Sequence, residues 1–257
     1  MVHFVGAGPG AADLITIRGA EMLKAADVVI YAGSLVNPEL LKLCGPATDV
    51  YDSAAMTLEQ IIEVITGAEA GKRTTVRLHT GDPSLYGAIR EQMDALDALG
   101  IGYDVTPGVS SFGAAAAALH AEYTLPGVSQ TLILSRMAGR TPVPEREAIS
   151  MLASHGASMA LFLSAGLLRE LQQELLKGAY SAETPAAIVY KASWEDEMLL
   201  PCTVETLAET GEKHGIRKTA LVLVGDFLNG NGERSSLYHP DFTTMYRAAI
   251  KEEGETK

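Results

Sequence analysis

Three apolar, strand-like stretches in the first half of the chain each run directly into a loop containing glycine and proline. The segments are HFVGAGPG at 3–10, VRLHTGDPSLYG at 76–87 and YDVTPGVSS at 103–111. Loops at the carboxyl ends of parallel strands line the crevice in which open α/β sheets bind ligands. The recurrence therefore predicts one ligand pocket assembled from three loops.

Strand-like and helix-like segments alternate over the first 120 residues. The expected strands cover 2–5, 27–33, 48–52, 74–80 and 103–106, and the expected helices cover 14–26, 57–70, 84–99 and 110–121. In the first helix, Leu14, Ile17, Met22 and Leu23 are the expected core-facing residues. Thr57 and Gln60 have the spacing of a capping box at the start of the second. Such alternation favours a mostly parallel sheet with helices on both faces.

The pattern breaks at 123–127 and then resumes. Strands are expected at 131–136, 159–164, 186–192, 198–204 and 219–225, with helices at 144–155, 166–178 and 204–214. Pro201 lies in the fourth of these strands and lacks an N–H donor, which indicates an edge or bulged strand. We predict an N-terminal α/β domain over 1–121, a C-terminal α/β domain with a mixed sheet over 122–240, and a tail over 241–257. The final KEEGETK is expected to be a frayed end.

Composition narrows the function classes. The chain has 257 residues, 47% of them hydrophobic, and a formal net charge of −12, which argues against nucleic acid as a partner. No apolar run reaches the roughly 18–20 residues of a membrane span, and the N-terminus shows no signal-peptide pattern, so we expect a cytoplasmic protein without a membrane partner. Cys44 and Cys202 lie outside any CxxC motif, and the six histidines show no metal-binding spacing, so no metal site is predicted.

The first loop fits the dinucleotide-binding string G-x-G-x-x-[GA] at residues 6–11. A dinucleotide site also needs an acid at the end of the second strand, where this chain has Ile30 to Gly33; the only acid of that strand, Asp27, stands at its beginning. Pro9 also removes a donor from the loop that would hold a pyrophosphate. An NAD- or FAD-dependent oxidoreductase is thus the weaker alternative, and a tight turn without a ligand is a third interpretation of this loop alone.

In the second loop, Asp82 stands between Gly81, which permits close backbone approach, and Pro83, which fixes the turn. The carboxylate has two compatible interpretations, as a ligand-binding group and as the N-cap of the helix expected at 84–99. Ser110 and Ser111 place hydroxyls at the start of the following helix, where they suit the polar parts of a small molecule.

These motifs carry a family resemblance. GAGPG followed by DLIT, the segment HTGDPSLYGA, the PGVSS loop and the late IRKTALVLVG resemble the tetrapyrrole methylase family over nearly the whole chain. The resemblance implies two α/β lobes with S-adenosylmethionine in the cleft between them, S-adenosylhomocysteine as product, and a homodimer.

Four further stretches resemble the members of that family that methylate corrin precursors at carbon 11. They are YAGSLVNPELL, SQTLILSRMAGRTPVPE, YKASWEDE and SLYHPDFTTMYR. The resemblance implies methyl transfer to precorrin-4 or cobalt-precorrin-4 in cobalamin biosynthesis, and both substrates remain open. A methylase acting on another tetrapyrrole or position, and a non-catalytic tetrapyrrole-binding protein, are the alternatives.

Binding residues follow from the family's motifs. For the cofactor, the resemblance implies Pro9, Thr80, Gly81, Asp82, Leu85, Ser110 and Ser111 from the loops, with Leu163, Ser164, Ala192, Thr219 and Ala220 from the second half. Methyl transfer from a sulfonium mainly requires alignment of the reacting atoms, without a metal. Asp82, Glu122 and Tyr123 are candidates for any base, and the sequence does not choose between them.

Corrin precursors carry many carboxylates, so an acidic enzyme must gather positive charge locally to bind one. The candidates are Arg136, Arg140, Lys191, Arg217 and Lys218, beside predicted strand ends. Each is also explained as solvated surface charge, and the group as a whole favours anion binding. Trp194 has two interpretations, as a stacking surface for the macrocycle and as a cap on an interface.

Overall fold

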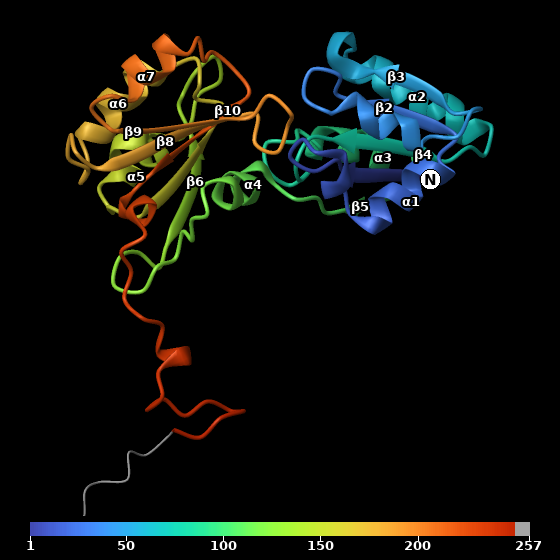
Figure 1. Cartoon of the computed structure of the whole chain (residues 1–257). Coiled ribbons are helices and arrows are strands. Elements are labelled where there is room, and N and C mark those ends of the chain that lie inside the picture. Colours follow the sequence, from blue (N-terminus) through green and yellow to red (C-terminus); the bar gives the residue numbers. More distant parts are fainter. Residues whose placement is uncertain (250–257) are drawn as a thin grey trace, which may run out of the picture. The chain divides into compact units, whose positions relative to one another are not determined.

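The computed structural model describes residues 1–249, which form two compact units (Figure 1). The first unit contains Met1–Leu119, Val189–Leu200 and Ile216–Leu221, and the second contains His120–Ile188, Pro201–Gly215 and the chain from Val222 onward. The predicted domains were each continuous in sequence. In the structure, two segments from the second half of the chain, Val189–Leu200 and Ile216–Leu221, belong to the first unit. Residues near 190 and 218 therefore share a unit with the three glycine loops.

The first unit holds a sheet of five parallel strands in the order β3-β2-β4-β1-β5. Its strands are β1 (Val2–Gly6), β2 (Val28–Tyr31), β3 (Asp49–Asp52), β4 (Thr75–His79) and β5 (Tyr103–Thr106). Val5 of β1 is in register with Leu78 on one side and Thr106 on the other. Because β4, β1 and β5 are neighbours, the three glycine loops leave the same edge of the sheet from adjacent strands.

Helices cover both faces of this sheet, as the alternating pattern predicts (Figure 1). On one face, α2 (Leu58–Ala70) and α3 (Arg90–Ala98) pack Ile65 and Leu96 against Phe4. On the other face, α1 (Ile17–Ala25) and the 3-10 helix η2 (Pro38–Leu43) pack Leu23 and Leu40 against the sheet. The predicted capping box of α2 is present between Thr57 and Gln60.

The first helix starts later than predicted. The Thr16 side chain accepts a hydrogen bond from the Gly19 N–H and caps α1, so Ile17 occupies the first helical position and is 86% exposed. Leu14 ends a separate 3-10 turn, η1 (Ala12–Leu14), and is exposed as well. The core assignments of Leu14 and Ile17 were wrong, whereas Leu23 is fully buried and Met22 packs beside it.

The helix expected at 84–99 is also shorter. α3 begins at Arg90, because Tyr86 and Ala88 have φ angles of +57° and +49°, which no continuous right-handed helix accommodates. The interpretation of Asp82 as the N-cap of this helix was therefore wrong. The alanine-rich helix is α4 (Ser111–Ala118), with its residues 114–116 buried.

The second sheet is mixed, as predicted, in the order β6-β7-β10-β8-β9. Its strands are β6 (Leu132–Arg136), β7 (Ser158–Phe162), β8 (Pro185–Tyr190), β9 (Met198–Thr203) and β10 (Ala220–Val224). β9, which contains Pro201, forms an edge, and this confirms the expectation from the proline.

Three helices, α5 (Ile149–Ala153), α6 (Leu168–Leu176) and α7 (Leu207–Lys213), belong to the second unit. The helix predicted at 144–155 is divided into a 3-10 turn, η4 (Glu145–Glu147), and α5, with Pro144 before the turn. In residues 1–249, no helix has the length and apolar character needed to span a membrane. The predicted frayed end KEEGETK lies outside the described residues.

Candidate functional site

The three loops meet at four glycines, Gly6, Gly8, Gly81 and Gly108. Gly8 and Gly81 exchange backbone hydrogen bonds, with N···O distances of 3.3 and 2.8 Å. A Cβ on Gly6 would lie 2.5 Å from the Gly108 Cα, and a Cβ on Gly108 would overlap the Gly81 carbonyl oxygen. The backbones of all three loops thus touch at one place, where a side chain at position 6 or 108 would force them apart.

Asp82 joins the second loop to the third. Its Oδ2 accepts a hydrogen bond from the Gly108 N–H at 2.9 Å, and its Oδ1 accepts one from the Ser84 N–H at 2.9 Å and another from the Ser84 hydroxyl. Partial burial by itself would raise the pKa of Asp82, but the bonds from Ser84 and Gly108 outweigh it, and the net effect lowers the pKa. Asp82 is therefore an ionised acceptor that holds two loops together.

The segment 189–200 holds the first loop. The Trp194 Nε1–H donates to the Pro9 carbonyl at 3.1 Å, and the Ser193 hydroxyl accepts from the Ala11 N–H at 3.0 Å. The Trp194 ring lies so close to Gly10 that a Cβ there would overlap it. Trp194 thus packs on the glycine loop itself. Sequence reasoning missed this contact, since nothing in the spacing connects positions 185 residues apart.

The side chain of Lys191 forms an ion pair within the same segment. Its ammonium lies 2.6 Å from Asp196 and 5.3 Å from the centroid of the Trp194 ring, and the hydrogen bond to Asp196 raises the pKa of Lys191. Its backbone N–H donates to the Thr219 carbonyl at 2.9 Å, which connects the segments 189–200 and 216–221. Of the predicted substrate-binding cations, Lys191 is thus already paired.

Backbone strain occurs at several residues of the second half of the chain. Leu163, Lys191, Ser193 and Thr219 have φ angles of +50°, +47°, +69° and +57°. This left-handed region costs an ordinary L-residue about 1–2 kcal/mol, and it is least accessible to a β-branched residue such as Thr219. Strain of this kind concentrates at binding sites, where the fold holds the backbone in a rare conformation. Leu163 and Thr219 are cofactor residues that the family resemblance implied, and Lys191 is a predicted substrate-binding cation.

The other implied cofactor residues of the first unit lie on the same loops. Thr80 and Leu85 are half-buried. Ser110 precedes α4 as its N-cap, and its side chain makes no capping hydrogen bond. Ser111 is the first residue of α4. Ala192 is buried beside the strained Lys191, and Ala220 begins β10.

In the second unit, the end of β7 presents Leu163 rather than Ser164. The Leu163 side chain is 68% exposed. Ser164 is fully buried, and its hydroxyl accepts from the Met137 N–H at 3.0 Å and donates to the Phe162 carbonyl at 2.7 Å. Ser164 therefore holds the chain reversal after β7 and exposes no hydroxyl to a ligand.

The two remaining base candidates lie in very different environments. Tyr123 is buried, packs against Phe227 with ring centroids 4.9 Å apart, and has its pKa raised by burial, which disfavours the phenolate. Glu122 is exposed and accepts a hydrogen bond from the Thr124 hydroxyl at 3.4 Å.

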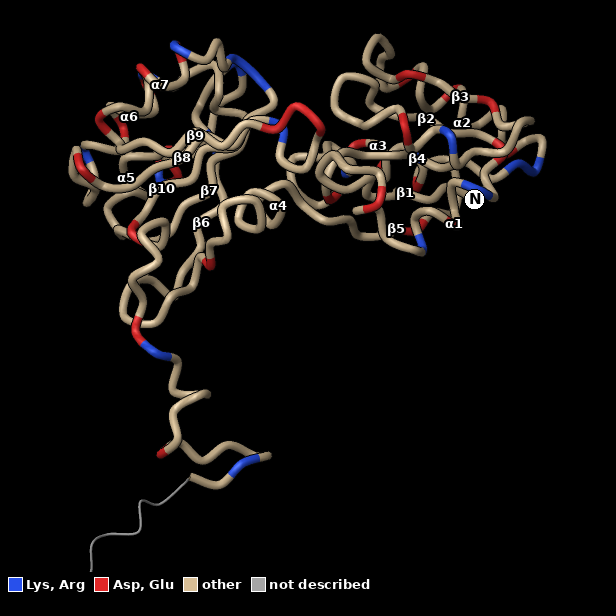
Figure 2. The backbone as a smooth tube through the Cα atoms, viewed as in Figure 1, with Lys and Arg blue, Asp and Glu red and all other residues tan. Residues whose placement is uncertain are grey.

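Some of the predicted substrate-binding cations already have partners within the protein, and others form no ion pair among the described residues. The Arg136 guanidinium donates to the carbonyls of Met137, Thr141 and Pro142 at 3.1, 3.2 and 2.8 Å, so it shapes its own loop. Within residues 1–249, Arg140, Arg217 and Lys218 are exposed and form no ion pair. Figure 2 marks the lysine and arginine positions of both units in blue. Arg217 and Lys218 directly precede the strained Thr219.

Comparison with known proteins identifies the family. The family model for Tetrapyrrole (Corrin/Porphyrin) Methylases matches residues 1–208. The chain belongs to the tetrapyrrole methylase family. It is 49% identical over 251 residues to the cobalt-precorrin-4 C(11)-methyltransferase of Methanocaldococcus jannaschii, with 97% of each chain covered. It is 44% identical over 254 residues to the precorrin-4 C(11)-methyltransferase of Mycobacterium tuberculosis, with 98% of each covered.

Solved structures of methylases share the fold. The X-ray structure of cobalt precorrin-4 methyltransferase, CbiF, has a TM-score of 0.87 at 44% identity and covers 88% of this chain and 95% of its own. Uroporphyrin-III C-methyltransferase from Thermus thermophilus, complexed with S-adenosylhomocysteine, has a TM-score of 0.74 at 27% identity and covers 91% and 95%. The predicted α/β methylase fold is confirmed. This methylase is a C-methyltransferase of the S-adenosylmethionine-dependent type.

Proposed function

We propose that this methylase transfers a methyl group from S-adenosylmethionine to carbon 11 of precorrin-4 or cobalt-precorrin-4 in cobalamin biosynthesis. The observation that carries the proposal is the difference in sequence identity between this chain and the various named methylases. Relatives named for carbon 11 are 43–49% identical, whereas a uroporphyrinogen-III C-methyltransferase of Bacillus subtilis is 28% identical over a similar length. A different regiochemistry within the family is the nearest alternative.

The three glycine loops, which meet at Gly6, Gly81 and Gly108, suit the binding of S-adenosylmethionine. The glycines at 6, 81 and 108 bring bare backbone to one place, and Thr80, Ser110 and Ser111 add hydroxyls around it. These residues would hold S-adenosylmethionine, which when bound supplies a methyl group activated by its sulfonium. The protein's contribution is rigidity, since Asp82 and Trp194 fix the three loops by direct hydrogen bonds.

The available cations fit a substrate with several carboxylates. Arg140, Arg217 and Lys218 are the predicted cations left without an ionic partner among the described residues. Arginine pairs with a carboxylate through two parallel N–H···O bonds, which orients as well as attracts it. Arg136 instead shapes the loop that contains Arg140, and Lys191 is paired with Asp196.

Proton transfer has one remaining candidate among the three residues considered. Asp82 uses both oxygens to hold loops, and burial raises the pKa of Tyr123 and so disfavours its phenolate, which leaves the exposed carboxylate of Glu122 to accept a proton. Glu122→Gln should then lower kcat more than it changes KM. An unchanged kcat would remove Glu122 from the mechanism.

The direct test is an incubation of the purified chain with isotopically methyl-labelled S-adenosylmethionine and each substrate form. We expect mass spectrometry to show a gain of one labelled methyl, and NMR to place it on carbon 11. A methyl at another carbon would support the alternative within the family.

Calorimetry with S-adenosylhomocysteine and with NAD tests the oxidoreductase hypothesis. Binding of S-adenosylhomocysteine alone excludes an oxidoreductase. Binding of the corrin precursor without turnover would indicate a tetrapyrrole-binding protein.

A further inference from the structure

Arg77, the middle residue of β4, carries a buried charge. It is 6% exposed, and it forms no ion pair with any residue in 1–249. Burial lowers the pKa of Arg77 to about 10, so the guanidinium stays charged at neutral pH. A buried charge without a counter-charge costs folding free energy, so its presence in the core requires an explanation. The proposed function does not supply one.

The groups around Arg77 are neutral. Gln92 of α3 is buried and carries no charge. His79, two residues further along β4, packs with its ring centroid 5.9 Å from that of Phe4, and its Nε2 has no hydrogen-bond partner among the described residues. Burial and the nearby charge of Arg77 lower the pKa of His79 to about 3, so its imidazole is neutral. Arg77 therefore acts on its surroundings through hydrogen bonds to uncharged groups.

These hydrogen bonds connect three segments of the first unit. The Arg77 Nη1 donates to the Ile30 carbonyl of β2 at 3.2 Å, and its Nε donates to the Gln92 Oε1 at 3.0 Å. The amide group of Gln92 continues the chain of bonds, because its Nε2 donates to the Ala88 carbonyl at 3.1 Å. One guanidinium is thus linked to the end of β2 and, through Gln92, to the loop before α3.

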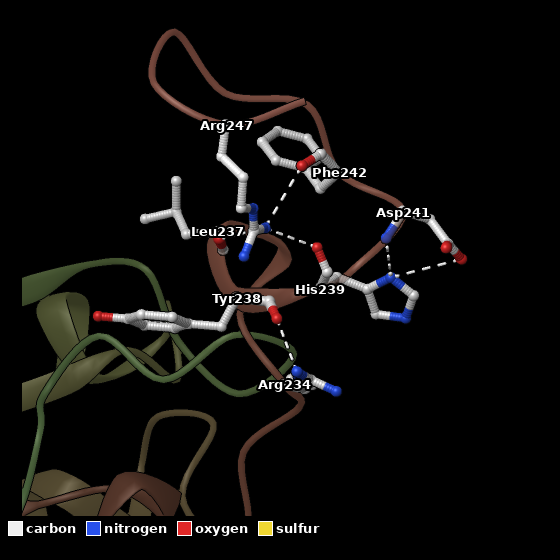
Figure 3. Close-up of polar contacts among 7 residues, drawn as sticks. All are labelled: Arg234, Leu237, Tyr238, His239, Asp241, Phe242 and Arg247. Carbon is white, nitrogen blue, oxygen red and sulfur yellow. Dashed lines mark hydrogen bonds and ion pairs between the residues drawn. The ribbon is translucent and has the colours of Figure 1, made fainter. Parts of the chain in front are cut away.

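Two other arginines of this chain also donate to carbonyls, but only to nearby ones. The Arg136 acceptors lie one to six residues away along the chain. The Arg247 Nη2 donates at 3.0, 2.7 and 3.3 Å to three carbonyls five to ten residues away, those of Leu237, His239 and Phe242 (Figure 3). The acceptors of Arg77 lie 47 and 15 residues away. Arg136 and Arg247 therefore shape their own loops, whereas Arg77 joins distant parts of the chain.

The segment 82–89, to which Gln92 donates, has a strained backbone. Its residues Tyr86 and Ala88 have left-handed φ angles, and a Cβ on Gly87 would lie 2.2 Å from the Pro83 carbonyl oxygen. The segment thus turns back tightly on itself. An ordinary L-residue keeps a left-handed conformation only where its surroundings impose it. The bond from Gln92 to the Ala88 carbonyl is such a constraint.

We propose that Arg77 is a positioning residue for cofactor binding. Through Gln92 it holds Ala88 in its left-handed conformation, and it thereby fixes the segment 82–89. This inference rests on the proposed function, in which Asp82 and Leu85 of that segment contact S-adenosylmethionine. The two directions of the guanidinium fork are what this role requires, because one direction reaches β2 and the other reaches Gln92.

Gln92→Glu tests the proposal with little change in side-chain size. The carboxylate still accepts from Arg77 and adds an opposite charge, but it has no N–H to donate to the Ala88 carbonyl. We expect urea unfolding to show stability at least equal to that of the wild type. The dissociation constant for S-adenosylhomocysteine should rise about 10-fold in calorimetry, and the amides of 84–89 should exchange hydrogen faster.

Gln172→Glu is the matched control. Gln172 is another helical glutamine whose Oε1 accepts a hydrogen bond, from the Ala208 N–H at 3.1 Å, and the carboxylate retains that acceptor. Affinity and exchange should equal those of the wild type. If Gln92→Glu leaves both quantities unchanged, or lowers affinity only in proportion to a loss of stability, the proposal is overturned.

Arg77→Lys and Arg77→Met separate the fork from the charge. Lysine keeps the positive charge but replaces the planar fork by a single ammonium, and methionine removes both. We expect lysine to weaken S-adenosylhomocysteine binding nearly as much as methionine does. Wild-type affinity in Arg77→Lys would show that charge alone suffices, which overturns the proposal. If Arg77→Met does not fold, the comparison of Gln92→Glu with its control decides the matter.

The outcome for the proposed function is read separately. A wild type that binds S-adenosylhomocysteine but methylates another carbon would contradict the proposed function, and the affinities of the variants would still test the role of Arg77. A wild type that methylates carbon 11, with variants of unchanged affinity, would overturn the role of Arg77 alone.

Discussion

The glycine loops and the strained residues shape the backbone in two different ways. At residues 6 and 108 the chain uses glycine, so the backbones approach closely because no side chain intervenes, and in the second loop Gly81 supplies a φ of +60°. At 163, 191, 193 and 219 ordinary residues take the left-handed conformation. The first arrangement is visible in the sequence and the second is not.

The difference has an energetic meaning. Glycine reaches positive φ without steric cost, although it loses more chain entropy on folding than other residues. Leu163, Lys191 and Thr219 hold the same conformation only because their surroundings impose it, as the bond from the Lys191 N–H to the Thr219 carbonyl does. Five substitutions test this comparison, and their expected effects decrease from Gly108→Ala to Thr219→Gly.

The largest effect is expected for Gly108→Ala. The added methyl would overlap the Gly81 carbonyl and lie 2.7 Å from the Gly6 Cα, so the three loops must separate. We expect the free energy of unfolding to fall by about 3 kcal/mol and S-adenosylhomocysteine binding to be lost in calorimetry. Gly45→Ala is the control, because its methyl meets nothing closer than 3.6 Å. Equal affinities in the two variants would refute the close-approach argument.

Asp82→Asn should have the next largest effect. The variant replaces an ionised acceptor by an amide that cannot accept from both Ser84 and Gly108 in the same way, which should cost about 1–3 kcal/mol of unfolding free energy at pH 7. Because folding lowers the pKa of Asp82, its stabilisation is present above the ordinary aspartate pKa of about 3.9 and disappears as the pH falls through the folded value.

Urea unfolding at pH 7, 5 and 3 checks this sign. The advantage of the wild type over Asp82→Asn should be similar at pH 7 and 5 and smaller at pH 3. An advantage that grows toward acid would contradict the assigned role.

Gly81→Ala tests the cost of backbone strain alone, because the added methyl would not collide with neighbouring atoms. A Cβ at Gly81 would have its nearest neighbour at 3.7 Å, so only the φ of +60° opposes it. We expect thermal denaturation to show a loss of about 1–2 kcal/mol with the loop contacts retained. A loss as large as that of Gly108→Ala would mean that the two glycines serve the same steric purpose.

Trp194→Phe should remove the hydrogen bond to the Pro9 carbonyl while keeping an aromatic ring beside Gly10. The expected loss is about 1 kcal/mol of unfolding free energy, with weaker S-adenosylhomocysteine binding because the first loop is less firmly held. Binding that is unchanged by calorimetry would confine Trp194 to a stabilising contact.

Thr219→Gly should have the smallest effect and the opposite sign. Glycine relieves the left-handed strain of a β-branched residue, and its greater chain entropy offsets part of the gain, so stability should rise by at most about 1 kcal/mol. Chemical denaturation measures the change. A clear loss of stability would show that the threonine side chain, rather than the backbone, is what this position requires.

The parallel sheet, its two helical faces and the edge position of the Pro201 strand were predictable from the sequence. Each rests on local chemistry: apolar runs of strand length, a capping box at Thr57, a missing N–H at Pro201. The errors at Ile17 and Asp82 arose where a helix pattern continued through residues whose backbone conformation ends it.

By itself, the sequence determined that three loops of glycine and proline follow three strands of a parallel sheet, because glycine permits and proline fixes particular backbone conformations wherever they stand. Only the tertiary structure decided that Trp194 holds the first loop, that Ser164 is buried while Leu163 is presented, and that Thr219 is strained. Those outcomes depend on contacts between residues far apart in the chain, and no local residue preference encodes them.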